Sequence, residues 1–120
     1  APDNTLTGWA YRPDALEICL RSAWQVGGGV PLLVTENGIA TSDDRVRIAY
    51  TREALRGLQR AAEDGVDVRG YLHWSALDNY EWGSWEPTFG LIGVDRMTFE
   101  RTPKPSLAWL GERAQTGELD

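Results

Sequence analysis

Cysteine is nearly absent from this chain, which has one in 120 residues. The single cysteine, Cys19, has no partner for an internal disulfide and no second thiol with which to bind a metal ion. Because Cys19 lies among apolar residues in a helical pattern, we expect its thiol to be buried and unreactive. We expect no metal site and no other cofactor.

Clusters of positive charge are also missing. The chain has 12 Lys and Arg residues against 18 Asp and Glu, a net charge of −6, and the basic residues are scattered. Nucleic acids and anionic membrane surfaces attract basic patches, so we expect neither as a partner. No stretch approaches the ~18 consecutive apolar residues of a membrane span. Residues 1–4 lack the basic-then-apolar pattern of a signal peptide, and we expect a cytoplasmic protein.

The length fits one domain, yet it is short for a closed (β/α)8 barrel, which has roughly 250 residues. A hydrophobic content of 42% and a charged content of 25% are ordinary for a globular protein. Six tryptophans are not ordinary and require an explanation. No repeat, low-complexity segment or linker divides the sequence, so we treat residues 1–120 as one domain.

The hydrophobic pattern predicts an α/β fold in the order helix, strand, helix, strand, helix. The expected helices span residues 13–26, 46–64 and 106–114, and the expected strands span 30–35 and 66–75. The first strand is apolar without alternation and the second again carries side chains on both faces, which is typical of covered parallel strands, and together they predict a βαβ unit. We expect residues 89–94 to be extended and residues 101–105 to form a turn. In the second helix, the expected inner face consists of Val46, Tyr50, Leu55, Leu58 and Ala62.

The first predicted strand ends in Thr35-Glu36-Asn37-Gly38, where a carboxylate and an amide precede a glycine that turns the backbone. The carboxyl ends of parallel strands are where α/β proteins place their active sites. A single glutamate at a strand end is a weak signal, because a solvent-facing surface residue would look the same. Glu36 is therefore a candidate that needs a second observation.

The second predicted strand supplies that observation. It ends near Trp74 and continues into a loop rich in aromatic and acidic residues, among them Glu81 and Trp82. Aromatic rings pack against the C–H groups of a sugar and carboxylates accept hydrogen bonds from its hydroxyls, so this edge suits a sugar. The alternative is that Trp74 and Trp82 fill the core and the acids are solvated. Spacing alone would pair Glu36 with Glu81 as the two catalytic carboxylates of a retaining glycosidase, about 5 Å apart.

Two motifs, Thr35–Gly38 and Trp74–Trp82, resemble the C-terminal part of glycoside hydrolase family 1, the β-glucosidases and β-galactosidases. The similarity continues through Phe89–Leu91, Val94-Asp95 and Arg101–Lys104, so it spans nearly the whole chain. Members of this family are retaining enzymes with a (β/α)8 TIM barrel. The resemblance implies that this chain provides strands seven and eight with their helices, and that the fold is incomplete on its own.

The resemblance also implies a role for each matching residue. Glu36 corresponds to the catalytic nucleophile and Glu81 to the residue that binds the 4- and 6-hydroxyls of the sugar. Trp82 corresponds to the indole that contacts the 3-hydroxyl, Trp74 to the aromatic platform under the sugar, and Phe89 to a residue that lines the pocket. These correspondences replace the pairing of Glu36 with Glu81 as the two catalytic groups.

Neighbouring residues receive other roles. The resemblance implies a cis peptide bond between Trp74 and Ser75. His73 precedes Trp74 on the strand, so its side chain points to the opposite face, and we expect it to be packed and hydrogen-bonded. We expect Asp78 and Asn79 to shape the loop.

One catalytic group has no counterpart in this sequence. The acid/base of the family lies in an Asn-Glu-Pro motif, whereas Trp85-Glu86-Pro87 occurs in another place and context. We expect residues 85–86 to lie near the entrance of the site, and the isolated chain to have little or no activity. The predicted function is hydrolysis of terminal non-reducing β-D-glycosidic bonds once the rest of the barrel, on another chain or through self-association, is present. The alternatives are a non-catalytic carbohydrate-binding piece and a self-assembling barrel fragment.

Overall fold

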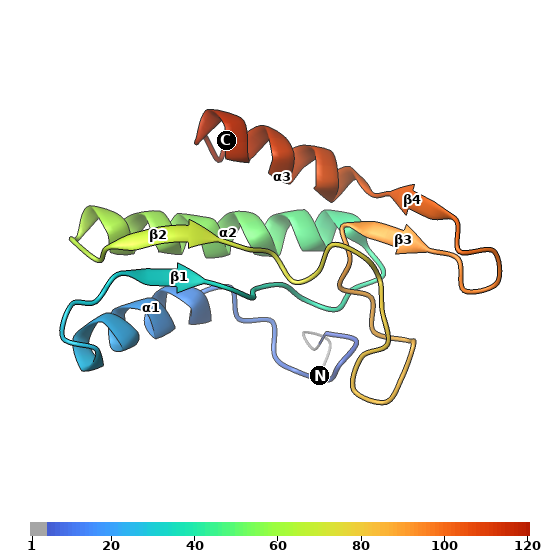
Figure 1. Cartoon of the computed structure of the whole chain (residues 1–120), viewed down its shortest axis with the longest axis horizontal. Helices are drawn as coiled ribbons and strands as arrows, with labels where there is room; N and C mark the ends of the chain where they lie inside the picture. Colours follow the sequence, from blue (N-terminus) through green and yellow to red (C-terminus); the bar gives the residue numbers. More distant parts are fainter. Residues whose placement is uncertain (1–4) are drawn as a thin grey trace.

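A computed structural model describes residues 5–120, which form three helices and two small sheets (Figure 1). The elements in chain order are α1 (Ala15–Val26), β1 (Leu32–Val34), α2 (Asp44–Glu63), β2 (Val68–Tyr71), β3 (Ile92–Val94), β4 (Arg101–Pro103) and α3 (Pro105–Thr116). The three predicted helices and two predicted strands are all present, and both strands are shorter than expected. Helix α2 lies between α1 and α3 and contacts both.

Strands β1 and β2 pair in parallel, as predicted for the βαβ unit. Leu33 lies opposite Gly70 and Val34 opposite Tyr71. Helix α2 connects the two strands, and Asp43 caps its N-terminus by accepting a hydrogen bond from the backbone N–H of Arg45. The parallel arrangement places the carboxyl ends of β1 and β2 at the same edge.

The prediction of a simple turn at residues 101–105 is wrong. Residues Arg101–Pro103 form β4, which pairs antiparallel with β3, so the chain contains a hairpin that the sequence pattern did not indicate. A three-residue strand that ends in proline has almost no strand signature, because proline lacks the N–H that a sheet ladder requires. The backbone N–H of Lys104 nevertheless donates to the carbonyl oxygen of Leu91, at 2.9 Å, and connects the hairpin to α3.

The buried face of α2 also differs from the prediction. Tyr50 is buried as expected, but Val46 and Ala62 are exposed, while the small residues Ala54 and Ala61 are buried completely. Helix α1 approaches closely at Gly57, where an added Cβ would lie 2.9 Å from the Cβ of Glu17. Close approach needs small side chains, so a search for large apolar residues misidentifies this face.

The expectation that Cys19 is buried is wrong as well, because its side chain is exposed. Leu20 is the buried residue of α1, and its neighbour Leu16 packs against the cluster around Tyr50. Only a narrow stripe of α1 therefore meets the rest of the chain, and Cys19 lies outside it.

Candidate active site

Glu36 follows β1 at the edge where β2 also ends. Its side chain is exposed, and the next residue is fixed from the neighbouring strand: the hydroxyl of Tyr71 donates to Oδ1 of Asn37, at 2.9 Å. Burial raises the pKa of Tyr71 far above its usual value, so the phenol stays protonated and keeps this hydrogen bond. The backbone that presents Glu36 is thus tied to β2 immediately beyond it.

The two strand ends are in direct backbone contact. The N–H of Trp74 donates to the carbonyl oxygen of Asn37, at 2.9 Å. A Cβ on Gly38 would lie 2.0 Å from the carbonyl oxygen of Trp74, a separation that no side chain tolerates. Only glycine fits at position 38, and this contact sets the separation between Glu36 and Trp74.

The peptide bond between Trp74 and Ser75 is cis, as the sequence resemblance implied. The indole Nε1 of Trp74 donates to Oε1 of Glu81 at 2.7 Å, and Glu81 is only 8% exposed. One oxygen of Glu81 therefore has a fixed partner, while the carboxylate retains further lone pairs for hydroxyl donors.

A tight turn displays Trp82 beside Glu81. The backbone groups of Glu81 and Ser84 exchange two hydrogen bonds, of 2.8 and 3.0 Å, around the central residues Trp82 and Gly83. Both central residues have positive φ, 51° and 83°, as in the type I′ turns of two-residue hairpins. Tryptophan is an unusual residue in this left-handed conformation, and the result is an indole that is 79% exposed.

The five residues singled out from the sequence surround one cavity of about 390 Å³. Its lining consists of Trp9, Glu36, Asn37, Gly38, Trp74, Glu81, Trp82 and Phe89. Phe89 is buried and closes one side of this cavity. The structure therefore brings Glu36, at the end of one strand, together with Trp74, Glu81, Trp82 and Phe89 from the next strand and its loop.

Trp9 belongs to this cavity although sequence reasoning assigned it no function. Its ring packs edge-on against Trp82, with 5.8 Å between centroids, and lies 6.5 Å from the ring of Phe89. The only sequence signal was a pair of aromatic residues, Trp9 and Tyr11, in a polar stretch, which does not indicate where the segment folds back. Trp9, Trp74 and Trp82 together account for half of the six tryptophans.

A second cavity, of about 570 Å³, adjoins the first and shares Trp9, Glu81 and Trp82 with it. Glu86 lines this second cavity. Trp85 packs edge-on against Tyr80, with 5.3 Å between ring centroids, and the guanidinium of Arg96 lies over the Trp85 ring at 5.8 Å.

Asp78 fixes the base of the loop that contains Glu81 and Trp82. Its Oδ1 accepts hydrogen bonds from the backbone N–H of Gly90 and from the ammonium of Lys104, both at 2.8 Å. Lys104 also donates to the carbonyl oxygen of Gly90, at 2.8 Å. Burial lowers the pKa of Lys104, and the adjacent Asp78 acts in the opposite direction. These hydrogen bonds confirm the expected loop-shaping role of Asp78.

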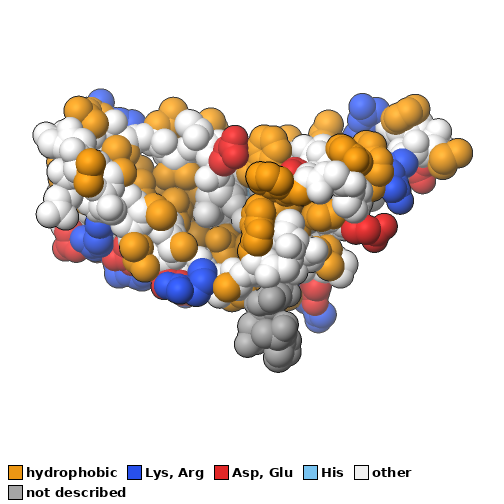
Figure 2. Space-filling model, turned by 90° about the horizontal axis from the view of Figure 1, so that it is seen from below, with side chains coloured by type: hydrophobic (Ala, Val, Ile, Leu, Met, Phe, Trp, Pro, Cys, Tyr) orange, Lys and Arg blue, Asp and Glu red, His pale blue; other side chains and the backbone are white. Residues whose placement is uncertain are grey.

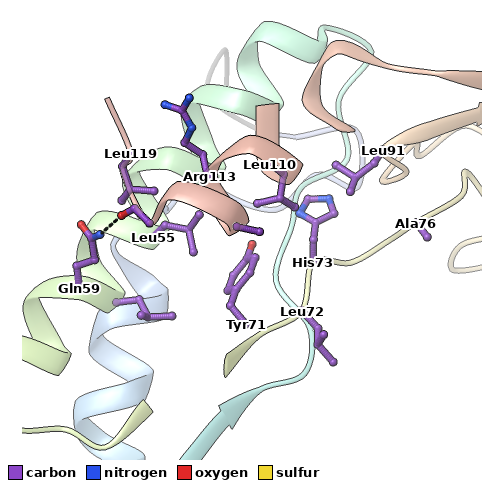
Figure 3. Close-up of a pocket in the computed structure, with 13 residues that line it drawn as sticks. Leu55, Gln59, Tyr71, Leu72, His73, Ala76, Leu91, Leu110, Arg113 and Leu119 are labelled. Atoms are coloured by element: carbon purple, nitrogen blue, oxygen red, sulfur yellow. Dashed lines mark hydrogen bonds between the residues drawn. The ribbon is translucent and has the colours of Figure 1, made fainter. Parts of the chain in front are cut away.

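His73 points away from the sugar-sized cavity, as predicted. Its ring lies beside Leu110 of α3 in an apolar groove of about 550 Å³ between α2, α3 and β2 (Figure 3). Its Nε2 donates to the carbonyl oxygen of Phe89, at 3.3 Å, and burial lowers the pKa of the imidazole to about 4. No carboxylate lies among the described residues that line this groove.

The arrangement suits nucleophilic chemistry on a bound sugar. An exposed carboxylate faces a pocket with aromatic walls and a second, buried carboxylate, which can orient a polyhydroxylated ring. Among residues 5–120, no group of three or more His, Cys, Asp and Glu side chains is placed to bind a metal ion. Nor does any helix of the described part have the length and apolar character needed to cross a membrane.

Known proteins resemble this chain in sequence and in structure. The bifunctional β-D-glucosidase/β-D-fucosidase of Bifidobacterium breve is 41% identical over 123 residues, covering 91% of this chain and 27% of that protein. The β-galactosidase of Sulfolobus acidocaldarius is 45% identical over 100 residues, or 82% of this chain and 20% of that protein. A β-glycosidase from Pyrococcus horikoshii superposes with a TM-score of 0.91 at 44% identity, covering 98% of this chain and 27% of that structure.

A family 1 β-glucosidase from Thermotoga maritima, solved in complex with isofagomine lactam, superposes with a TM-score of 0.92 at 29% identity. The match covers 98% of this chain and 29% of that structure. The chain therefore spans about a quarter of the length of these relatives. Residues 2–118 match the sequence profile of glycosyl hydrolase family 1, which is nearly the entire chain. This chain belongs to glycosyl hydrolase family 1.

Proposed function

We propose that this chain supplies the nucleophile and part of the sugar site of a retaining β-glycosidase. The substrate is a terminal, non-reducing β-D-glycoside, and the reaction is its hydrolysis. The main support is geometric: Glu36 shares one cavity with Trp74, Glu81, Trp82 and Phe89, although these residues come from two different strand ends. The family to which the chain belongs supports the same reaction.

Glu36 acts in the first of two steps. One of its carboxylate oxygens attacks the anomeric carbon, an ester bond to the sugar forms, and the bond to the leaving group breaks. The proton for the leaving group comes from an acid/base residue outside this chain, because the sequence lacks the Asn-Glu-Pro motif. Water then cleaves the ester and restores Glu36, and the two inversions leave the β configuration unchanged.

The other residues hold the sugar for this attack. Glu81 accepts hydrogen bonds from the 4- and 6-hydroxyls, and the hydrogen bond from Trp74 fixes the direction of its carboxylate. Trp82 contacts the 3-hydroxyl, and Trp74 also provides the aromatic surface under the ring. Because these groups are positioned before the sugar arrives, little ordering remains to be done in the transition state.

We infer further that the chain provides strands seven and eight of a (β/α)8 barrel and functions only with the rest of it. Its accessible surface is 7452 Å², whereas a folded monomer of its mass exposes about 6,500 Å². Its radius of gyration is 15.1 Å, against about 13.5 Å for a compact domain of this length. Hydrophobic side chains spread across the middle of one face (Figure 2), which suits a surface that packs against further protein.

The experiment that tests the proposal identifies which anomer of the sugar is released first. We expect this chain, combined with the remainder of its barrel, to hydrolyse an aryl β-D-glucoside with the β-sugar as the first product in a proton NMR time course. The Glu36→Gln variant should lose at least about 10⁴-fold in kcat, because the amide cannot form the ester. The α-sugar as first product, or a Glu36→Gln variant of normal activity, would contradict the proposal. So would a barrel that binds the sugar without turnover.

A further inference from the structure

Arg47, in the first turn of α2, is a buried cation that the reaction does not use. Its side chain is only 1% exposed, and its guanidinium has three hydrogen-bond acceptors. Nη1 donates to Oδ1 of Asp44 at 2.6 Å, and Nη2 donates to two backbone carbonyl oxygens, those of Thr41 at 2.8 Å and Thr88 at 2.6 Å. A charge this deeply buried is costly unless it is paired, so the position has a specific requirement for it.

The two carbonyl groups belong to the two loops that form the sugar cavity. Thr41 lies five residues beyond Glu36, and Thr88 immediately precedes Phe89. The backbone N–H of Thr41 donates to the carbonyl oxygen of Thr88, at 3.1 Å, and the hydroxyl of Thr88 donates to the carbonyl oxygen of Thr41, at 2.9 Å. Arg47 therefore joins the loop that follows the nucleophile to the end of the loop that binds the sugar.

Asp44 and Ser106 hold Arg47 in this orientation. The hydroxyl and backbone N–H of Ser106, at the start of α3, donate to the two oxygens of Asp44 at 2.8 and 2.7 Å. Burial alone would raise the pKa of Asp44, but hydrogen bonds from Arg47 and Ser106 outweigh it and keep the pKa below its usual value. The carboxylate is thus charged at neutral pH and pairs with Arg47.

We propose that Arg47 is a positioning residue, which sets the distance between the nucleophile Glu36 and the sugar-binding side chains by bridging the carbonyl groups of Thr41 and Thr88. This inference rests on the proposed function, because it assigns Arg47 a part in the same site. Arginine suits the task, since two donors from one planar group fix two acceptors at once. A lysine ammonium keeps the charge but lacks the planar geometry.

The kinetic test uses the complete barrel and compares Arg47→Met and Arg47→Lys with Arg45→Met. Arg45 is a matched control, since it lies on the same helix and pairs only with exposed Asp43. At a temperature where every variant is folded, we expect Arg47→Met to lower kcat/KM for an aryl β-D-glucoside about 100-fold, largely through kcat, because a displacement of about 1 Å is that costly. The kcat/KM of Arg47→Lys should lie between those of the wild type and Arg47→Met. The kcat/KM of Arg45→Met should stay within about 2-fold of the wild-type value.

A structural measurement separates this inference from the proposed function. The amide proton of Thr41, which donates to Thr88, should exchange at least about 10-fold faster in Arg47→Met, whereas the amide of Leu32, bonded to Asp67 at 2.8 Å, should be unchanged. If the wild-type barrel has no turnover, the proposed function fails and exchange alone decides on Arg47. Unchanged exchange at Thr41, or a variant with a lower Tm but unaltered kcat and KM, would overturn the inference.

If Arg47→Met does not fold, Arg47→Lys decides, because it keeps the buried charge but loses the planar pair of donors that holds the carbonyl groups of Thr41 and Thr88. We expect faster exchange at Thr41 and a smaller loss of kcat in the same direction. Normal exchange and normal kcat in this variant would contradict the proposal.

Discussion

At the scale of single residues, Gly38 has as much influence on the site as the glutamate two positions before it. The backbone of the nucleophile segment touches the carbonyl oxygen of Trp74 there, with no room for a side chain. Glu36 and the aromatic platform are consequently placed by one contact between main chains. The glycine of the Glu36-Asn37-Gly38 motif is thus a packing requirement.

Replacing Gly38 by alanine tests this contact. The added Cβ would force the two strand ends apart, and we expect the Gly38→Ala complete barrel to lose about 1–3 kcal/mol of unfolding free energy. Displacement of Glu36 from the sugar should also lower kcat about 100-fold. Urea denaturation and steady-state kinetics measure the two effects.

Gly111 provides the matched control. It lies inside α3 with open space around the position of its Cβ, so Gly111→Ala should stabilise the protein by about 0.5–1 kcal/mol and leave kcat unchanged. A Gly38→Ala variant as stable and as active as the wild type would show that the close approach does not govern the site.

His73 gives the stability a pH dependence. Its folded pKa of about 4 lies below the ordinary value of 6.5, so between these values the unfolded chain binds a proton that the folded chain excludes. The free energy of unfolding of the wild type should therefore fall relative to that of His73→Gln, by roughly 2–3 kcal/mol from about pH 7 to about pH 4.5. Denaturation curves of both proteins at several pH values provide the measurement, and a constant difference would contradict the assigned burial.

The residues that line the candidate site were accessible from the sequence, except Trp9, because their types are specific. A strand-end glutamate and a dense run of tryptophan and acidic residues have few purely structural explanations together. Trp9 was not accessible, since its role depends on a chain reversal that brings it against Trp82. The burial of Ala54 and Ala61 was equally hidden, because small residues reveal close helix packing only once the helices are placed.

At the scale of elements, the loop that contains Glu81 and Trp82 depends on its attachment to the β3–β4 hairpin. Asp78 at the start of the loop binds Lys104, which lies just beyond β4, and both contact Gly90. Position 90 is another close approach, where a Cβ would lie 2.2 Å from the backbone nitrogen of Asp78. The hairpin therefore serves as the support for the loop.

A double-mutant cycle measures this support. We expect Asp78→Asn and Lys104→Met to show a coupling free energy of about 1–2 kcal/mol in the complete barrel, because the pair is half-buried and shares a backbone partner. The exposed pair Asp67 and Arg69 is the control, and its coupling should stay below about 0.5 kcal/mol. Equal coupling in both pairs would count against a supporting role for the hairpin.

The long periodic helix α2 and the extended residues 89–94, which contain β3, were predictable, whereas β4 was not. The 20 residues of α2 have a clear apolar pattern and a capping aspartate, and the predicted bounds lie within two residues of those observed. The hairpin strands have three residues each, and pairing with β3 defines β4 rather than any local preference. The role of the hairpin in holding Asp78 becomes visible only in the three-dimensional contacts.

At the scale of the whole molecule, the chain exposes more surface than a folded monomer of its mass, and its parallel sheet has only two strands. The isolated chain should associate or remain partly unfolded, since its exposed apolar groove and unpaired strand edges favour contact with more protein. Sedimentation velocity should find species larger than 13.4 kDa, and assays of the isolated chain should find little or no hydrolysis. A stable, fully active monomer would contradict the proposed incompleteness.

The most direct test of the account is covalent trapping of the nucleophile. The complete barrel is incubated with a 2-deoxy-2-fluoro β-D-glucoside, whose fluorine slows hydrolysis of the ester, and the protein is examined by intact mass and peptide sequencing. The account predicts one sugar adduct per site, attached to Glu36, and no adduct in Glu36→Gln. An adduct on Glu81 or any other residue, or normal turnover of a β-D-glucoside with no adduct at Glu36, would contradict it.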